Sequence, residues 1–278
     1  MTGTRARLRA AAFSDIGLHR ATNQDAAFTS TWGAAVADGV GGGPAGDLAS
    51  ATFIHRLAAG RLDGLEPLQL ADSVRSANWD LRAHVERDPS LLGMATTFTG
   101  IFVARDGGVL LAHTGDSRAY RLRRGQLVQV SRDDSLVQAL VDQGLVSIAE
   151  AASHPRRNLI TASLSGAERD GAAVIAFDAP VGDRWLLCSD GLTDYVPDAD
   201  IRALLVGIPD AAAAAEACVT LALDAGSRDN VTVVVCDIVD PELLRRTRGL
   251  AARRAELAPT SFYGAAATRF MEGLESSA

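Results

Sequence analysis

Three aspartates lie at the ends of short apolar runs, each beside a residue that favours turns. Asp38 follows Ala34-Ala35-Val36-Ala37 and precedes Gly39, Asp190 precedes Gly191, and Asp229 precedes Asn230. Asp116 occupies a fourth turn, Gly115-Asp116-Ser117-Arg118. Because Asp-Gly and Asp-Asn pairs are common in turns for structural reasons alone, each aspartate taken singly is best explained as a turn residue. Gathered at one place, however, the same carboxylates would suit a hard divalent cation.

The stretch after Asp38 is rich in glycine and first suggests a phosphate-binding loop. It reads Gly39-Val40-Gly41-Gly42-Gly43-Pro44-Ala45-Gly46-Asp47, and glycines let a backbone approach a ligand closely. No Lys-Ser or Lys-Thr pair closes the stretch, so it is not a P-loop. Asp38 would also repel a bare phosphate unless a metal ion lay between the two charges. The sequence therefore favours a metal-assisted phosphate site.

Short strands and helices must position these residues. Apolar runs predict strands at 10–16, 26–29 and 32–37, and helical spacing predicts helices at 48–58 and 67–86. Four strand-like runs separated by tight turns follow at 96–104, 109–114, 119–122 and 126–130. Connections this short are typical of antiparallel pairing, so we expect a four-stranded meander and exclude a Rossmann sheet.

The second half of the chain repeats this mixture of elements. The pattern predicts helices at 136–143, 148–153, 199–205 and 211–223, and strands at 174–177, 185–188 and 231–235. We expect strands 174–177 and 185–188 to form an antiparallel pair, because only a short connection that contains Pro180-Val181-Gly182-Asp183 joins them. After Pro241 the composition shifts to Arg and Ala with weak periodicity, which predicts a domain of residues 1–240 followed by a C-terminal helix or mobile tail at 241–278.

Composition excludes several classes of protein. The 278 residues are 47% apolar and 22% charged, which is ordinary for a soluble globular protein. The net charge of −7 argues against nonspecific nucleic-acid binding. No apolar run approaches the ~20 residues that span a membrane, and the basic N-terminus leads into too short an apolar run for a secretory signal. Three cysteines without a CxxC pair predict reduced core thiols in a cytoplasmic protein.

Taken together, the motifs around these aspartates resemble those of the metal-dependent Ser/Thr protein phosphatases of the 2C type (the PPM family), bacterial branch. The resemblance covers about residues 10–238 in the family's order. It is carried by Gly17-Leu18-His19-Arg20 with Asn23-Gln24-Asp25, Ala37-Asp38-Gly39-Val40-Gly41-Gly42, Ala95-Thr96-Thr97, Ala112-His113-Thr114-Gly115-Asp116-Ser117-Arg118-Ala119-Tyr120, Leu187-Cys188-Ser189-Asp190-Gly191-Leu192-Thr193 and Ser227-Arg228-Asp229-Asn230-Val231-Thr232. A single Asp-Gly pair is weak evidence, whereas this ordered set is specific.

The resemblance implies a fold and a metal centre. The fold would be α+β, a four-layer αββα sandwich of two antiparallel β-sheets flanked by helices. Two divalent cations, Mn²⁺ or Mg²⁺, would lie at one end of the sandwich, with a weaker third ion beside them. By match, Asp38 would bridge the two ions, the Gly39 carbonyl would ligate one, and Asp190 and Asp229 would hold the other. Asp116, together with Asp190, would bind the third ion.

The resemblance also assigns groups around the metals and a reaction. Arg20 would bind the phosphate, and Gln24 and Asp25 would orient metal-bound water without ligating the metal. The implied activity is hydrolysis of phosphoserine and phosphothreonine on proteins by a water that two metals activate. Such an enzyme would oppose a bacterial Ser/Thr kinase, with phosphorylated proteins as substrates. We expect a monomer that binds neither nucleic acid nor membrane.

Some positions depart from the family pattern. Val40 stands where some relatives carry a histidine proposed as general acid, and the usual Asp-His-Ser block reads Asp133-Asp134-Ser135. Residues 158–166 match their family segment only loosely, so the sequence leaves substrate preference open. Two alternatives also remain open. One is a phosphoprotein-binding or scaffold module with little catalysis, and the other is a metal phosphohydrolase acting on small molecules.

Overall fold

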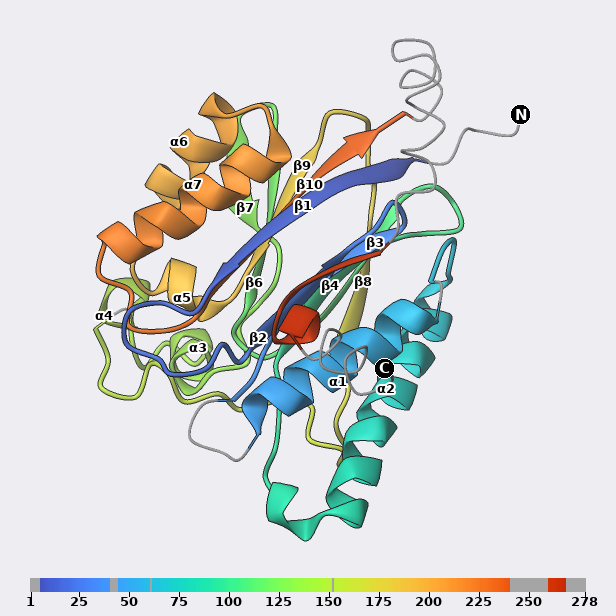
Figure 1. The fold of residues 1–278 in the computed structure, drawn as a ribbon. Coiled ribbons are helices and arrows are strands. Elements are labelled where there is room, and N and C mark those ends of the chain that lie inside the picture. The colour runs from blue at the N-terminus through green and yellow to red at the C-terminus, as the bar shows by residue number, and fades with distance from the viewer. Residues whose placement is uncertain (1–5, 41–44, 61, 152, 241–259, 269–278) are drawn as a thin grey trace.

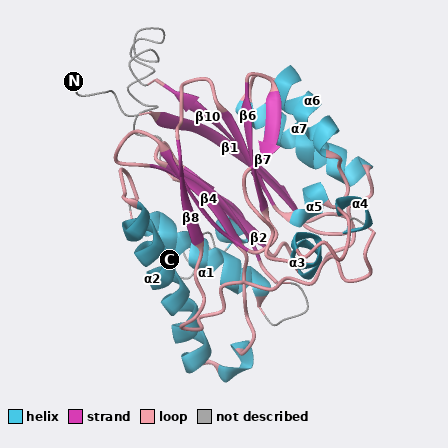
Figure 2. Ribbon diagram, turned by 180° about the vertical axis from the view of Figure 1, so that it is seen from behind, coloured by secondary structure: helices cyan, strands magenta, loops and turns pink. Residues whose placement is uncertain are grey.

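Two antiparallel sheets are stacked face to face, with helices on both outer faces (Figures 1 and 2). The structure is a computed structural model that describes residues 6–40, 45–60, 62–151, 153–240 and 260–268. The five-stranded sheet has the order β1 (Arg7–Asp15), β10 (Val231–Val239), β9 (Arg184–Cys188), β6 (Arg118–Arg123), β7 (Gln126–Gln129). The six-stranded sheet has the order β11 (Ser261–Gly264), β2 (Asp25–Thr29), β3 (Gly33–Asp38), β4 (Phe98–Val103), β5 (Val109–Thr114), β8 (Ala173–Phe177). The predicted αββα sandwich is confirmed.

Helices from two parts of the chain cover the two sheets. The six-stranded sheet is covered by α1 (Gly46–Ala59) and α2 (Pro67–Arg87), after which comes a short 3₁₀ turn, η1 (Pro89–Leu91). The five-stranded sheet is covered by α5 (Asp190–Thr193), α6 (Asp198–Gly207) and α7 (Ala211–Asp224). Two further short helices, α3 (Leu136–Asp142) and α4 (Ile148–Ala151), lie at one end of the sandwich. None of the described helices is long and apolar enough to cross a lipid bilayer.

The core explains why β2 and β3 are almost uninterrupted runs of small apolar residues. Both strands are buried on both faces, because Ala26, Ala35 and Ala37 face the helices and Ala27, Ala34 and Val36 face the other sheet. A strand covered on both sides loses the usual alternation of apolar and polar residues. The alanines leave room for α1 to lie close against the sheet. The three cysteines are free and buried in the core, as predicted.

Two of the strand pairings predicted from the sequence are wrong. Strands β4 and β5 pair, as do β6 and β7, but β5 and β6 belong to different sheets, so the predicted four-stranded meander is divided. Likewise β8 pairs with β5, and β9 pairs with β10 and β6. In a two-layer sandwich a short connection can carry the chain across to the facing sheet, where the next strand buries its apolar face equally well.

The C-terminal segment contributes a strand that the sequence analysis missed. Most of the predicted helix or tail at 241–278 lies outside the described residues. Within 260–268, Ser261–Gly264 form β11, which pairs antiparallel with β2, and Ala265 and Ala266 are buried in the core beneath α1. Residues 261–264 therefore form a strand where we expected a helix or a tail, while 265–268 are helical. The domain boundary at residue 240 stays a prediction.

Candidate functional site

Asp38 is held at the end of β3 by hydrogen bonds that its backbone N–H and its backbone carbonyl both form with Thr97. Its backbone N–H donates to Thr97 Oγ1 at 3.0 Å, and its carbonyl accepts from the Thr97 N–H at 2.8 Å. The Thr97 hydroxyl is itself 2.8 Å from Ser117 Oγ. Thr97 was part of a recognised motif without a role, and the structure shows that it fixes the backbone that carries Asp38.

Gly39 follows Asp38 at a point where two backbones meet. A Cβ at Gly39 would lie 2.3 Å from the carbonyl oxygen of Gly46, at the start of α1, and 2.8 Å from that of Gln24. No side chain fits there, so the glycine is required by close packing of β3 against the first turn of α1. The remaining glycines of the stretch, Gly41–Gly43, lie outside the described residues.

The other aspartates reach the same end of the sandwich from neighbouring elements. Asp190 begins α5 directly after β9, and Asp229 precedes β10, which pairs with β9. Asp116 lies in the short connection that crosses from β5 to β6. The structure therefore brings together all four aspartates that the sequence suggested as metal ligands.

Electrostatics show how closely these carboxylates lie. Burial raises the pKa of Asp38 well above its ordinary value, and the charges of Asp25, Asp190, Asp116 and Asp229 raise it further. Burial likewise raises the pKa of Asp190, with Asp116 as the next largest cause. Burial also raises the pKa of Asp116. Buried like charges of this kind call for a cation to neutralise them.

Unpartnered oxygens within the cluster point to the same need. Among the described residues, Asp25 Oδ1 and Asp190 Oδ1 are buried carboxylate oxygens without a hydrogen-bond partner. Such atoms are rare because an unsatisfied buried acceptor is costly. No three His, Cys, Asp or Glu side chains of the described part of the chain converge tightly enough to hold a metal alone. The residues thus fit oxygen-binding cations that keep several waters, as Mg²⁺ does, better than a closed protein cage.

Arg20 faces the cluster from the loop between β1 and β2. Its Nη2 donates to Asp229 Oδ2 at 2.6 Å. Partial burial is the largest single influence and would lower the pKa of Arg20, but the hydrogen bond to Asp229 and the neighbouring carboxylate charges together outweigh it, so the net change is upward. The charges of Asp38 and Asp190 act in the same upward direction. Arg20 is therefore the cation that balances part of this carboxylate cluster, and its side chain remains partly exposed.

Asp25 lies directly across from Asp38 in the pairing of β2 with β3. Its Oδ2 accepts a hydrogen bond of 2.7 Å from Ser189 Oγ, and the Ser189 hydroxyl in turn accepts one from the Thr232 N–H. Burial raises the pKa of Asp25 too. Ser189 thus links β2 to β9 and β10 beneath the cluster. Apart from the position of Ser189 next to Asp190, no sequence pattern predicted this role.

Gln24 and Asn230 hold the loop that carries Arg20. The Asn230 side chain donates to the carbonyls of Ile16 and Thr22 at 2.9 and 3.1 Å and accepts from the Gln24 N–H at 2.8 Å. The Gln24 carbonyl accepts from the Gly39 N–H at 3.1 Å. That the Gln24 side chain orients metal-bound water stays a prediction. Asn230, which the sequence suggested only as a turn residue, is the clamp between this loop and β10.

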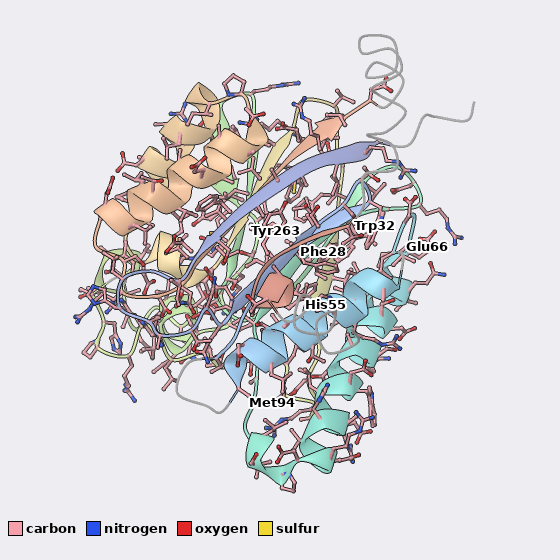
Figure 3. The ribbon with its side chains drawn as sticks, viewed as in Figure 1. Phe28, Trp32, His55, Glu66, Met94 and Tyr263 are labelled. Atoms are coloured by element: carbon pink, nitrogen blue, oxygen red, sulfur yellow. The ribbon has the colours of Figure 1, made fainter. Side chains whose placement is uncertain are left out.

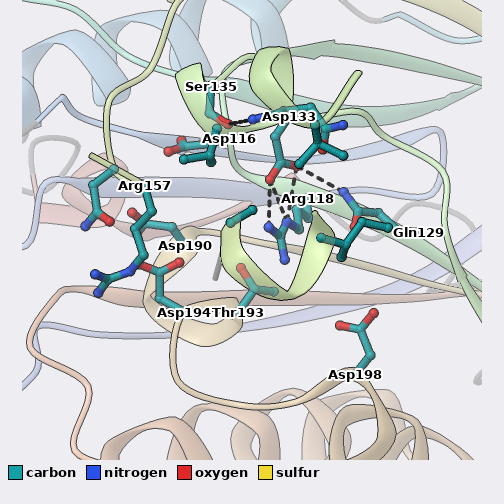
Figure 4. Close-up of a pocket in the computed structure, with 16 residues that line it drawn as sticks. Asp116, Arg118, Gln129, Asp133, Ser135, Arg157, Asp190, Thr193, Asp194 and Asp198 are labelled. Carbon is teal, nitrogen blue, oxygen red and sulfur yellow. Dashed lines mark hydrogen bonds and ion pairs between the residues drawn. The ribbon is translucent and has the colours of Figure 1, made fainter. Parts of the chain in front are cut away.

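A cavity of about 320 Å³ adjoins the cluster on the side of α3 and α4. Asp116 and Asp190 lie at its edge, and Arg157, Asp194 and Val137 are among the other residues that line it (Figure 4). Within it, Arg118 forms a bidentate pair with Asp133, with N–O distances of 2.7–3.1 Å. Asp133, which begins the block that departs from the family pattern at Asp134, therefore has a structural role as the partner of Arg118.

Comparison with known proteins supports the resemblance found in the sequence. A sequence model of the protein phosphatase 2C family matches residues 19–221. The serine/threonine protein phosphatase PstP of Mycobacterium tuberculosis is 47% identical over 239 residues, which cover 84% of this chain but only 45% of PstP. The serine/threonine phosphatase stp of Listeria innocua is 31% identical over 77% of this chain and 86% of its own length.

Solved structures agree with the architecture. A crystal structure of the M. tuberculosis phosphatase PstP superposes with a TM-score of 0.77 at 46% identity, covering 83% of this chain and 98% of that one. The catalytic domain of PstP in complex with two manganese ions gives a TM-score of 0.76 at 43% identity, covering 84% and 100%. The chain spans less than half the length of full PstP, so the similarity concerns the part of PstP that carries this fold.

Proposed function

The chain belongs to the protein phosphatase 2C family, and on this premise we propose that it is a metal-dependent phosphatase that hydrolyses phosphoserine and phosphothreonine in proteins. One observation carries the proposal. Four aspartates from separate elements gather at one end of the sandwich with an arginine facing them. The buried carboxylates have too few partners within the protein and can bind metal ions, and the arginine can bind a phosphate group.

We assign the metal ligands to this chain's own residues. Asp38 would bridge two divalent cations, the Gly39 carbonyl would ligate one, and Asp190 and Asp229 would hold the other. Manganese is supported by the two ions bound to the catalytic domain of PstP, and magnesium is the alternative of the same hard-cation class. Asp116, with Asp190, would hold a weaker third ion. When bound, such ions lower the pKa of water and neutralise charge on a phosphoryl group.

Arg20 would exchange its carboxylate partner for the substrate. Its guanidinium now pairs with Asp229, and a bound cation would compete for the same carboxylate. The freed fork can then grip two phosphate oxygens and orient the ester for in-line attack. Asp25, held by Ser189, keeps Asp38 in place. Val40 has no acidic group, so the leaving alkoxide would take its proton from a water molecule and not from this side chain.

The cellular setting is proposed from the relatives. The two relatives named above are bacterial serine/threonine phosphatases, which supports phosphorylated proteins as substrates and a role in signal transduction opposite a Ser/Thr kinase. We propose a cytoplasmic monomer, in keeping with its reduced cysteines.

Phosphate release from a phosphothreonine peptide tests the function. We expect release that depends on Mn²⁺, stops with EDTA and collapses in Asp38→Asn and Asp229→Asn. Asp72→Asn is the matched control, because Asp72 is an exposed carboxylate on α2 that pairs with its neighbour Arg75. Full activity of either site variant would overturn the metal assignment. Hydrolysis of small phosphate esters with phosphopeptides untouched would favour a small-molecule hydrolase, and peptide binding without hydrolysis would favour a scaffold.

A further inference from the structure

The C-terminal strand β11 closes an edge of the catalytic sandwich next to the candidate site. It pairs residue by residue with β2, from Ser261 opposite Thr29 to Gly264 opposite Ala26. On its other side β2 pairs with β3, which ends in Asp38. Every residue of β2 is buried, and a buried strand needs partners for its backbone groups on both sides. Within the described sheet, β11 supplies them on the outer side.

Side chains anchor β11 to both layers that surround it. Phe262 packs toward the helices, with its ring 4.3 Å from the ring of His55 on α1. Tyr263 points toward the space between the sheets, where its hydroxyl is 3.4 Å from Thr29 Oγ1. His55 Nε2 also lies 2.8 Å from the carbonyl oxygen of Ala266. Figure 3 shows His55 on α1 and Tyr263 on the strand beside it. The segment is therefore docked by specific contacts from two elements, α1 and β2.

The last residue of β11, Gly264, lies in close contact with the backbone of Asp25, the residue opposite Asp38. Gly264 has a φ of +61°, and a Cβ there would lie 2.2 Å from the carbonyl oxygen of Asp25 and 2.9 Å from Ser14 Oγ. Asp25 is the cross-strand neighbour of Asp38. The Ser14 hydroxyl accepts from Asn23, in the loop that carries Arg20. Gly264 is therefore connected to the candidate site in two ways, through Asp25 to Asp38 and through Ser14 to the loop that carries Arg20.

We propose that β11 is a positioning element: by docking on β2 it fixes the backbone of Asp25 opposite Asp38 and thereby sets the affinity of the site for divalent cations. The inference rests on the proposed metal centre and adds a control of that centre by a segment downstream of β10. Loss of β11 would leave the edge of β2 unpaired and let Asp25 move relative to Asp38. Groups that orient metal ligands change affinity by about 10- to 100-fold when they are removed.

Direct binding of Mn²⁺ to the full chain, without substrate, tests the proposal. Gly264→Ala adds a methyl group against the Asp25 carbonyl at a left-handed position, and we expect Mn²⁺ to bind about 10-fold more weakly in calorimetric titration. Amide hydrogen exchange should show that Ser261–Gly264 lose protection. The matched control is Gly182→Ala, which has the same kind of strain (φ +97°) in the turn between β8 and β9 but open space around the added methyl group. Its Mn²⁺ affinity should equal that of the wild type.

A second variant guards against misfolding of the first. Phe262→Ala removes the ring that packs on His55 and leaves Gly264 and Asp25 untouched, so weaker Mn²⁺ binding in this variant also supports the proposal. Variants that free the β11 amides yet bind Mn²⁺ as tightly as the wild type would overturn it, as would an equal loss in Gly182→Ala. Failure of the proposed function is distinguishable, because it would show as absent phosphatase activity or absent Mn²⁺ binding in the wild type itself.

Discussion

The two sides of the candidate site are built in different ways. On the sandwich side, Asp38, Asp190 and Asp229 each adjoin a strand whose residues are nearly all buried. On the other side, residues 131–171 form two short helices that contain no buried residue. That segment leaves large apolar side chains exposed, among them Leu145, Ile148 and Leu159. The cavity of Figure 4 lies between the two sides.

Under the proposed function, this contrast would separate the residues that carry out the chemistry from the surface that meets the substrate. Residues fixed by burial and pairing hold a demanding geometry, because moving one strand end would disturb a packed core. A segment with few buried contacts costs little to rearrange and suits the recognition of varied partners. Changes on the sandwich side should therefore impair every substrate, whereas changes in residues 131–171 should affect only substrates large enough to reach them.

The largest effect should come from Gly39→Ala. Its methyl group would lie 2.3 Å from the backbone of Gly46, so Asp38 and the start of α1 must separate. We expect about 1–3 kcal/mol of lost stability from overpacking and about 100-fold lower activity from misplacement of Asp38. Chemical denaturation and steady-state kinetics measure the two. Gly171→Ala is the control, because the added methyl group lies in open space on the other side of the site, and it should change neither stability nor activity. A Gly39→Ala variant with full activity would show that close packing at Gly39 is not needed to position Asp38.

Arg20→Lys should have the next largest effect. Lysine keeps the charge but lacks the planar fork that can hold two phosphate oxygens. We expect kcat/KM to fall about 10- to 100-fold, corresponding to about 1.5–3 kcal/mol for one charged hydrogen bond. Because this loss concerns the phosphate itself, a phosphopeptide and para-nitrophenyl phosphate should lose activity alike. A loss confined to the peptide would place Arg20 among the recognition residues instead.

Arg157→Ala should affect a phosphopeptide and a small substrate differently, in contrast to Arg20→Lys. Arg157 lines the cavity from residues 131–171 and lies 3.6 Å from Asp194, with 42% of its side chain exposed. An exposed pair at this distance contributes about 0–1 kcal/mol, so thermal stability should be unchanged. We expect KM for a phosphopeptide to change by a few-fold and para-nitrophenyl phosphate hydrolysis to stay the same. Arg75→Ala, in an exposed pair on α2, is the control, and equal losses on both substrates would contradict the contrast.

Local patterns in the sequence predicted that the aspartates of the sandwich side lie at strand ends, and the family resemblance singled them out as site residues. Asp38, Asp190 and Asp229 follow or precede apolar runs that do form strands, and a strand end is set by nearby residues. The choice of partner strand was not predictable in the same way. The connections β5–β6 and β8–β9 are short, and such a connection serves a hairpin or a crossing between sheets equally well. Only the packing of two sheets decides between them.

Contacts between distant residues explain the other omissions. Ser189 meets Asp25 across 164 positions of the chain, and Asn230 meets Thr22 across 208. Neither contact leaves a periodic signal in the sequence. The four residues of β11 are too few for a pattern, and the strand is stabilised by its fit between β2 and His55. Propensity is a weak guide for such an edge strand, because tertiary packing decides its conformation.

The smallest expected effect is a pH-dependent change in stability that involves His113, a residue that links the sandwich side of the site to residues 131–171. This residue of β5 is buried, with Nδ1 2.9 Å from Thr99 Oγ1 and Nε2 2.9 Å from the carbonyl oxygen of Arg132. Burial lowers the pKa of His113 below 6.5, although nearby Asp134 and Asp133 oppose this. The folded state thus favours the neutral ring, so its contribution to stability is complete above about pH 6.5 and is lost as the pH falls from there through the lower pKa that His113 has in the folded protein.

Chemical denaturation at pH 7.5 and 5.5 checks this sign. The wild type should lose more free energy of unfolding between the two pH values than His113→Gln, since an amide can donate to the Arg132 carbonyl but does not titrate. The carboxylates of the site titrate in both proteins, and the difference between the two therefore isolates the imidazole. Equal losses would mean that protonation of His113 does not weaken its links to Thr99 and Arg132. The two sides of the site would then be joined mainly by the pair of Arg118 with Asp133.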